Sequence, residues 1–207
     1  MTSAREASPS VEAFFDETTN TLSYVVSDPT SGVCAVIDSV LNLDYASGTI
    51  STEGADEILA YIERSALKLE WLLETHVHAD HLSAAPYIQH ALGGRIAISQ
   101  AIATVQDTFG EVFGEGPEFP RDGSQFDALL NDGDAIALGS ITGCAMATPG
   151  HTPACMSFVF GDCVFVGDTL FMPDGGTARA DFPGCLLYTS DAADDMQCVD
   201  LGGRRII

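Results

Sequence analysis

One seven-residue segment, THVHADH at positions 75–81, constrains the fold of this chain more than any other. It holds three of the chain's five histidines and an aspartate, and it follows the apolar run Trp71–Leu73. The apolar run predicts a short buried strand. Side chains alternate with a period of two in extended chain, so His76 and His78 are expected to point the same way. The last two residues are expected on the turn into the next helix. Four ligand-type side chains can therefore converge on one metal ion such as zinc or iron.

The rest of the chain predicts a mixed α/β layer fold, because strands alternate with helices and are then followed by a run of strands. Two apolar, β-prone runs, Leu22–Val26 and Cys34–Ile37, are separated by a turn-rich segment and predict paired strands. Residues 1–10 are polar and predict a loose lead-in. The remaining predicted elements are the helices Glu53–Leu67 (with Thr52 as its cap), Ser83–Leu92 and Ala101–Phe113, and the strands Arg95–Ile98, Ala135–Leu138, Cys144–Ala147, Met156–Phe160 and Val164–Val166.

Two shorter motifs carry ligand-type residues just after predicted strands. TPGHT places His151 in a Pro-Gly turn after Cys144–Ala147, and Gly167-Asp168-Thr169 places an acid after Val164–Val166. Either motif alone is a common loop pattern. Together with the histidine segment they predict one site, because strand ends are where sheets of this kind gather functional groups.

Charge and hydropathy exclude some kinds of partner. The 207 residues carry 30 acids against 8 bases, a net charge of −22, and Lys68 is the single lysine. A surface this negative repels phosphate backbones and anionic lipids, so neither nucleic acid nor membrane is expected as a partner. No apolar run approaches the roughly 18 residues that cross a bilayer, and no signal peptide is visible. We expect a cytoplasmic protein with reduced cysteines.

In order and spacing, the motifs HVHADH, TPGHT and GDTLF resemble those of the metallo-β-lactamase superfamily. The stretches VEAFFDETTNTLSYVV, LETHVHADHLSAAPYI, TPGHTPAC and GDTLFMPDGGTARADFPG resemble one branch of it, the persulfide (sulfur) dioxygenases and the related bacterial β-lactamase-like hydrolases. The resemblance runs from about Val11 to Gly184. It implies an αββα sandwich with the metal at one edge of two packed sheets, and a possible homodimer.

The resemblance also implies a ligand set. Persulfide dioxygenases hold one ferrous iron with two histidines and a carboxylate, which here correspond to His76, His151 and Asp168. His78, Asp80 and His81 are then expected to orient the ligands and bound water, with Asp80 and His81 contributing to catalysis, or to form a latent second metal site. Thioester hydrolases of the glyoxalase II type instead hold two metals and commonly have a further histidine where this chain has Cys155.

The implied activity is oxidation of glutathione persulfide by O2 to sulfite and glutathione. Arg179 is a candidate for gripping a substrate carboxylate, or for a structural ion pair with a neighbouring aspartate. Cys155 is a candidate lining residue of the substrate pocket, or a small buried hydrophobic residue. A zinc hydrolase of glutathione thioesters with one or two metals is the first alternative, and a persulfide-binding module without activity is the second.

The last 23 residues of the chain, 185–207, differ from the rest in their sequence pattern. Residues 185–195, CLLYTSDAADD, have no clear periodicity and resemble a translated sequencing adapter. We therefore expect residues 11–184 to form an incomplete, C-terminally truncated domain and residues 185–207 to be a tail that is not native to it.

Overall fold

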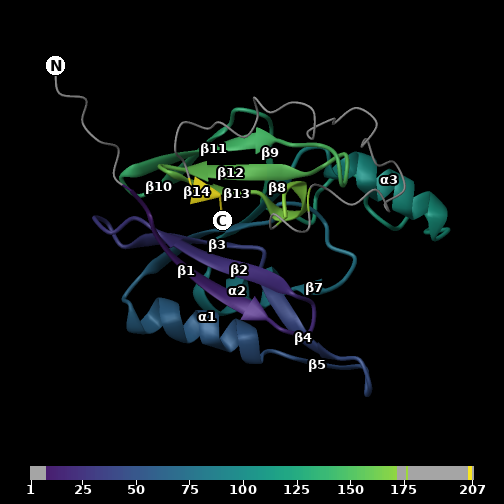
Figure 1. The fold of residues 1–207 in the computed structure, drawn as a ribbon. Helices are drawn as coiled ribbons and strands as arrows, with labels where there is room; N and C mark the ends of the chain where they lie inside the picture. Colours follow the sequence, from purple (N-terminus) through teal and green to yellow (C-terminus); the bar gives the residue numbers. More distant parts are fainter. Residues whose placement is uncertain (1–7, 172–175, 177–204, 207) are drawn as a thin grey trace.

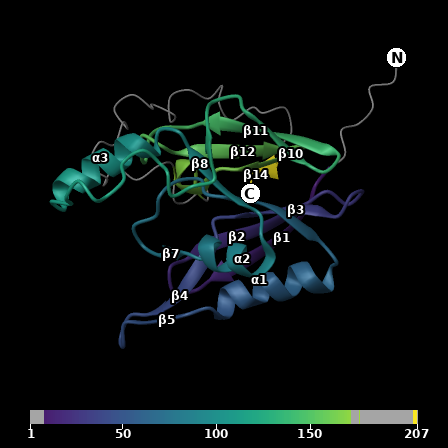
Figure 2. The ribbon, with the colours of Figure 1, turned by 180° about the vertical axis from the view of Figure 1, so that it is seen from behind.

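The computed structural model describes residues 8–171, Gly176 and residues 205–206, and the structural statements below concern these residues. Two sheets pack face to face, and helices cover the outer face of the first (Figures 1 and 2). The first sheet has the order β1 (Ser10–Asp16), β2 (Thr21–Ser27), β3 (Val33–Ile37), β6 (Lys68–Leu73), β8 (Arg95–Ser99) and β9 (Ala128–Leu130). The second has the order β10 (Ala135–Leu138), β11 (Ile141–Ala147), β12 (Met156–Phe160), β13 (Cys163–Phe165) and β14 (Arg205–Ile206).

Strand direction changes within the first sheet and decides which strand ends meet. β1, β2 and β3 form an antiparallel meander, whereas β3, β6, β8 and β9 run parallel to one another. In the second sheet β10 to β13 are antiparallel neighbours, so β11 and β13 run in the same direction. A small third sheet joins β5 (Thr49–Ser51), β4 (Val40–Asp44) and β7 (Leu82–Ser83).

The main core lies between the two large sheets. It combines Ile37 and Leu73 of the first sheet with Phe158, Phe160 and Phe165 of the second, and each of these side chains is at most 1% exposed. A second apolar cluster joins the other face of the first sheet to α1 (Glu53–Arg64) and α2 (Ala85–Leu92). The third helix, α3 (Ile102–Val112), lies at one end of the sandwich (Figure 1). Burial on both faces of the first sheet explains why its central strands are continuous apolar runs.

The predicted layered α/β sandwich is confirmed, and the predicted helices and strands are present with shifts of a few residues. Six strands were not predicted: β1, β4, β5, β7, β9 and β14. The first of them starts at Ser10, which pairs with Ser27 instead of ending a loose lead-in. Thr52 does stand at the start of α1, but its hydroxyl donates to the Asp56 carboxylate and not to the helix backbone. No helix within the described part of the chain is long and apolar enough to cross a membrane.

Candidate metal centre

Four strand ends meet at one edge of the sandwich and carry the predicted site. Asp38 follows β3, the histidine segment 75–81 follows β6, His151 lies in the turn after β11, and Asp168 lies in the short 3-10 helix η1 (Gly167–Thr169) after β13. The two sheets are joined here, since the Met156 amide donates to the Thr75 carbonyl at 2.9 Å. Parallel strands, and alternate strands of an antiparallel sheet, end on the same side. This topology therefore brings together motifs that are far apart in the sequence.

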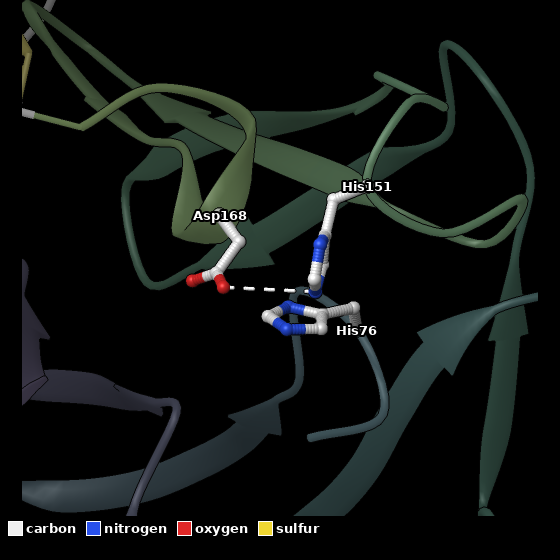
Figure 3. Close-up of side chains that lie close together, drawn as sticks. All are labelled: His76, His151 and Asp168. Carbon is white, nitrogen blue, oxygen red and sulfur yellow. Dashed lines mark ion pairs between the residues drawn. The ribbon is translucent and has the colours of Figure 1, made fainter. Parts of the chain in front are cut away.

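His76, His151 and Asp168 form a compact triad, drawn in Figure 3. One ligand atom of each lies within 4.8 Å of the others, and His151 Nε2 is 3.6 Å from Asp168 Oδ2. The two imidazole rings stand perpendicular with centroids 5.0 Å apart. Both histidines are buried, whereas the Asp168 side chain is 36% exposed. The two rings are thus fixed by the interior, and the carboxylate lies at the opening of the site.

Thr75 and Asp38 orient the His76 ring. The Thr75 hydroxyl donates to Asp38 Oδ2 at 2.7 Å and lies 3.0 Å from His76 Nδ1. Because the single hydroxyl proton goes to Asp38, His76 Nδ1 must carry the proton it shares with Thr75, and Nε2 keeps its lone pair. Burial, together with the nearby charge on His78, holds the pKa of His76 well below its ordinary value. The ring is therefore neutral and presents Nε2 as a donor to a metal.

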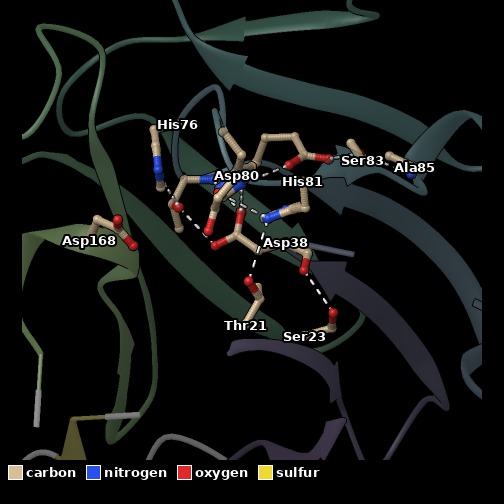
Figure 4. A network of polar contacts seen from close by, with 12 residues as sticks. Thr21, Ser23, Asp38, His76, Asp80, His81, Ser83, Ala85 and Asp168 are labelled. Carbon is tan, nitrogen blue, oxygen red and sulfur yellow. Dashed lines mark hydrogen bonds and ion pairs between the residues drawn. The ribbon is translucent and has the colours of Figure 1, made fainter. Parts of the chain in front are cut away.

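His78 faces two carboxylates. Figure 4 shows the network of polar contacts around one of them, Asp38. Its Nε2 lies 3.3 Å from Asp38 Oδ1 and 3.4 Å from Glu74 Oε2. Burial lowers the pKa of His78, but hydrogen bonds and charge from the two carboxylates outweigh it and raise the value to about 10. Burial likewise opposes ionisation of Asp38, yet hydrogen bonds from His78 and Thr75 lower its pKa. Burial prevails at Glu74 and raises the pKa of that carboxyl.

Asp80 and His81 complete the histidine segment. His81 Nδ1 lies 3.3 Å from Asp80 Oδ1 and 3.4 Å from the Thr21 hydroxyl. Burial, reinforced by the charge on His78, lowers the pKa of His81 to about 4. His81 Nε2 is buried and has no hydrogen-bond partner among the residues that the structure describes. His78, Asp80 and His81 form a second group whose ligand atoms lie within 4.8 Å of one another.

The spacing of His151 and Asp168 and the chemistry of the donor groups fit a metal ion. Two ligands at about 2.1 Å from one zinc or iron ion can be at most about 4.2 Å apart, and the 3.6 Å between His151 and Asp168 satisfies that limit. Neutral buried imidazoles and a carboxylate are the donors that zinc and ferrous iron accept. An unpartnered buried imidazole nitrogen at His81 is costly unless a ligand completes it. The chemistry of the side chains thus supports metal binding and does not distinguish the two metals.

Within the described part of the chain, two cavities reach histidines of the segment 75–81. One of about 470 Å³ is lined by Asp38, His78, Asp80 and Asp168 together with aromatic and aliphatic side chains. Another of about 320 Å³ is lined by His76, His78 and His81 and is otherwise mostly apolar. The first cavity borders the triad at Asp168, whose side chain is 36% exposed.

Cys155 and Arg179 were the two residues that the sequence predicted to contact the substrate. Cys155 is 3% exposed and lines neither cavity. Its sulfur accepts a hydrogen bond from the Thr152 backbone amide and lies 3.2 Å from the Thr152 hydroxyl. Burial raises the pKa of this thiol. Its predicted contact with substrate stays a prediction. Arg179 lies outside the described residues.

Sequence reasoning missed three residues of the centre: Asp38, Glu74 and Thr75. Asp38 could have been found by the rule that pointed to Asp168, since both are acids directly after an apolar strand. Its φ of +49° marks a strained position of the kind that clusters at functional sites. Glu74 and Thr75 belong to the motif region but carry no ligand-spacing signal of their own.

Comparison with known proteins decides the family. The sequence model of the family described as "Metallo-beta-lactamase superfamily" matches residues 17–206. The chain belongs to this superfamily. Among solved structures, the chain resembles ETHE1 from Myxococcus xanthus, with a TM-score of 0.70 and 25% identity over 92% of this chain and 71% of that one. The predicted fold and the predicted membership are thereby confirmed.

The curated relatives of this chain are named for different activities. A probable metallo-hydrolase of Burkholderia pseudomallei is 55% identical over 84% of this chain and 63% of its own length. Glyoxylase B2 of Dictyostelium discoideum is 45% identical over 84% and 60%, and human persulfide dioxygenase ETHE1 is 29% identical over 83% and 56%. The chain thus spans about half to two thirds of the length of these three relatives.

Proposed function

We propose that this chain binds one ferrous iron ion through His76, His151 and Asp168 and oxidises glutathione persulfide with O2. The balanced reaction consumes one persulfide, one O2 and one water, and it yields glutathione and sulfite with release of protons. The terminal sulfur is oxidised and O2 is reduced, so no further electron donor is needed. A cytoplasmic homodimer is part of the same proposal.

The triad is the observation that carries this proposal. Two histidines and one carboxylate are the donor set of non-haem iron oxygenases, and three protein ligands leave positions open for O2 and substrate. The likeness to the persulfide dioxygenases ETHE1 of human and of Myxococcus xanthus supports the same reading. Iron bound there would supply the redox chemistry.

The residues of the chain would supply orientation and shelter. Thr75 and Asp38 fix His76 in the tautomer that binds metal, and burial of His76 and His151 keeps bulk water from that side. The cavity beside Asp168 would hold the persulfide. Asp80 and His81 are proposed to orient bound water and ligands, and Arg179 and Cys155 are proposed to contact the substrate.

Oxygen uptake is the test of this proposal. The 207-residue chain is loaded with ferrous iron under anaerobic conditions, and O2 consumption and sulfite are measured after glutathione persulfide is added. We expect sulfite and consumed O2 in equal amounts, with both lost in His151→Ala. Persulfide that binds without any O2 consumption by the iron-loaded chain would contradict the proposal and favour a binding module.

A zinc-dependent hydrolase of glutathione thioesters is the second candidate. The group formed by His78, Asp80 and His81, with its unpartnered buried nitrogen, offers a second metal site, and the relatives named metallo-hydrolase and glyoxylase support it. A zinc-bound hydroxide would be the nucleophile of such an enzyme. Thioester hydrolysis by the zinc-loaded chain, without O2 uptake by the iron-loaded chain, would establish this alternative.

A further inference from the structure

Tyr24 is a tyrosine packed between the two sheets that the proposed chemistry does not use. It pairs with Ile37 across β2 and β3, and Asp38 follows Ile37 in the chain. Ser23, the residue before Tyr24, donates to the Asp38 carbonyl at 2.8 Å, as Figure 4 shows. The Tyr24 ring packs edge-on against Phe165 of β13, with ring centroids 5.2 Å apart. Both sheets therefore fix this ring beside the strand ends that carry the metal centre.

The hydroxyl of Tyr24 is open to a cavity. It has no hydrogen bond within the described part of the chain, although the residue is only 8% exposed. The described side-chain atoms that are both fully buried and unpartnered are Glu74 Oε2 and His81 Nε2, so the Tyr24 hydroxyl is not enclosed in the core. Tyr24 lines the cavity of about 470 Å³ beside Asp168. Because buried tyrosines usually satisfy their hydroxyl within the protein, this one is available to a molecule in the cavity.

The same hydroxyl has a proton to donate. Burial and the charge on Asp38 raise the pKa of Tyr24 to about 12, so the group is protonated at neutral pH. The other hydroxyls that line the cavity, those of Thr19 and Thr21, already have hydrogen-bond partners. No lysine or arginine lines this cavity among the residues that the structure describes. Tyr24 thus offers an anionic ligand a hydrogen bond that these neighbours do not.

We propose that Tyr24 is a substrate-binding residue whose hydroxyl donates a hydrogen bond to an anionic sulfur group in this cavity. That group is the terminal sulfur of the persulfide before the reaction and an oxygen of sulfite after it. Hydrogen bonds to charged acceptors are stronger than those between neutral groups, so one hydroxyl can contribute substantially to affinity. This inference rests on the proposed function for the identity of the ligand.

Sulfite binding tests the inference without measuring activity. The whole chain is loaded with Zn²⁺, which has no redox chemistry, and the Kd for sulfite is measured by calorimetry. Tyr24→Phe keeps the ring on Phe165 and removes only the hydroxyl. The Kd should rise about 10- to 100-fold, the usual range for a hydrogen bond to a charged group, with unchanged zinc content. No sulfite binding by the unmodified chain, or an equal Kd for both chains, would overturn the inference.

Tyr61→Phe is the matched control. Tyr61 also packs edge-on against a phenylalanine, Phe14, with ring centroids 5.7 Å apart. It lies on α1 and lines neither of the cavities that reach the histidines. The control should bind sulfite like the unmodified chain. Equal weakening by Tyr61→Phe and Tyr24→Phe would show that the effect does not come from the cavity.

Steady-state kinetics of the iron-loaded chain separate binding from a structural role. Tyr24→Phe should raise the KM for glutathione persulfide about 10-fold and change kcat by less than about twofold, because the lost hydrogen bond holds substrate. A lower kcat with an unchanged KM would contradict substrate binding by Tyr24. Absence of O2 uptake by the unmodified chain would contradict the proposed function alone, and sulfite binding would still decide the role of Tyr24.

A measurement on the unmodified chain covers the case in which Tyr24→Phe does not fold. Ser23–Tyr24 is the only serine–tyrosine pair in the sequence, so isotope labels on both residue types assign the Tyr24 amide and, through it, the Tyr24 ring. When sulfite is added to the zinc-loaded chain, we expect the magnetic resonance signal of the Tyr24 ring carbon that bears the hydroxyl to shift. The corresponding signal of Tyr61 should not move. A Tyr24 signal that stays in place at saturating sulfite would refute the proposed hydrogen bond.

Discussion

His76 and His78 lie two residues apart on the same loop, and their surroundings give them opposite properties. His76 faces His151 and Asp168, which come from the second sheet, and its ring is neutral. His78 faces Asp38 and Glu74, which come from the first sheet, and its ring holds a proton. The comparison teaches that a histidine motif by itself does not define a ligand set. The partner contributed by each sheet decides which nitrogen of an imidazole the neighbouring side chains engage and how its pKa shifts.

The largest expected effect comes from removing the partner of His76 in the second sheet. His151→Ala deletes one of the triad's two imidazoles, so metal affinity should fall by more than about 100-fold. Loss of a residue that only orients a ligand typically costs about 10- to 100-fold. Metal content after dialysis measures this. His90→Ala is the control, because His90 is an exposed histidine in the last turn of α2. Equal metal loss in both variants would contradict the assignment of the triad.

A smaller effect is expected when the orientation of His76 is disturbed. Thr75→Val keeps the shape of the side chain but removes the hydroxyl that bridges Asp38 and His76, so metal affinity should fall about 10- to 100-fold. Thr75→Ser retains the hydroxyl and should retain most of the affinity. If Thr75→Val binds metal as tightly as Thr75→Ser, the hydroxyl does not orient the ring.

The close contact between the two sheets at the metal centre can be tested at Gly167, whose backbone lies against Thr75. This residue has a φ of +49°, and a Cβ there would collide with the Thr75 hydroxyl. Gly167→Ala should lower the free energy of unfolding by about 1–3 kcal/mol and weaken metal binding, because strain and overpacking combine. Denaturant unfolding measures the first effect.

Gly133→Ala separates these two causes. Gly133 also has a positive φ, of +83°, but no atom lies within 4 Å of the position of its Cβ. This control should show the cost of backbone strain alone and leave metal affinity unchanged. Equal loss of metal affinity in both variants would contradict the proposed role of the contact with Thr75.

The smallest effect is expected in the pH dependence of the metal-free chain. The pKa of His78 is raised to about 10, so its stabilising contribution is full below its unfolded pKa of about 6.5 and is lost as pH rises toward 10. The pKa of His76 is lowered, so the unfolded chain binds a proton there first and stability falls as pH drops below about 6.5. His78→Gln should flatten the alkaline slope of stability, and His76→Gln the acidic slope. Identical profiles of stability against pH for the two variants would contradict the opposite pKa shifts of His76 and His78.

Much of this centre could be predicted from local sequence. The spacing of His76, His78, Asp80 and His81 after an apolar run predicted a cluster at a strand end, and the rings of His76 and His78 do lie 4.1 Å apart. His151 and Asp168 were predicted by the same strand-end rule, and the structure brings both to His76. The edge strands were harder, because β5, β7 and β9 have only two or three residues and little periodicity.

Strand ends and a period of two are local properties of the chain, so the sequence predicted that the histidine segment, His151 and Asp168 lie at strand ends. The groups that each of these side chains faces depend on how the two sheets pack. Asp38 is 40 positions from His78, and Asp168 is 92 positions from His76, so no local pattern relates them. The packing of two sheets sets those distances, and the distances between charged and polar atoms set proton positions. The same residue type therefore lies in a triad with His151 and Asp168 at position 76 and beside two carboxylates at position 78.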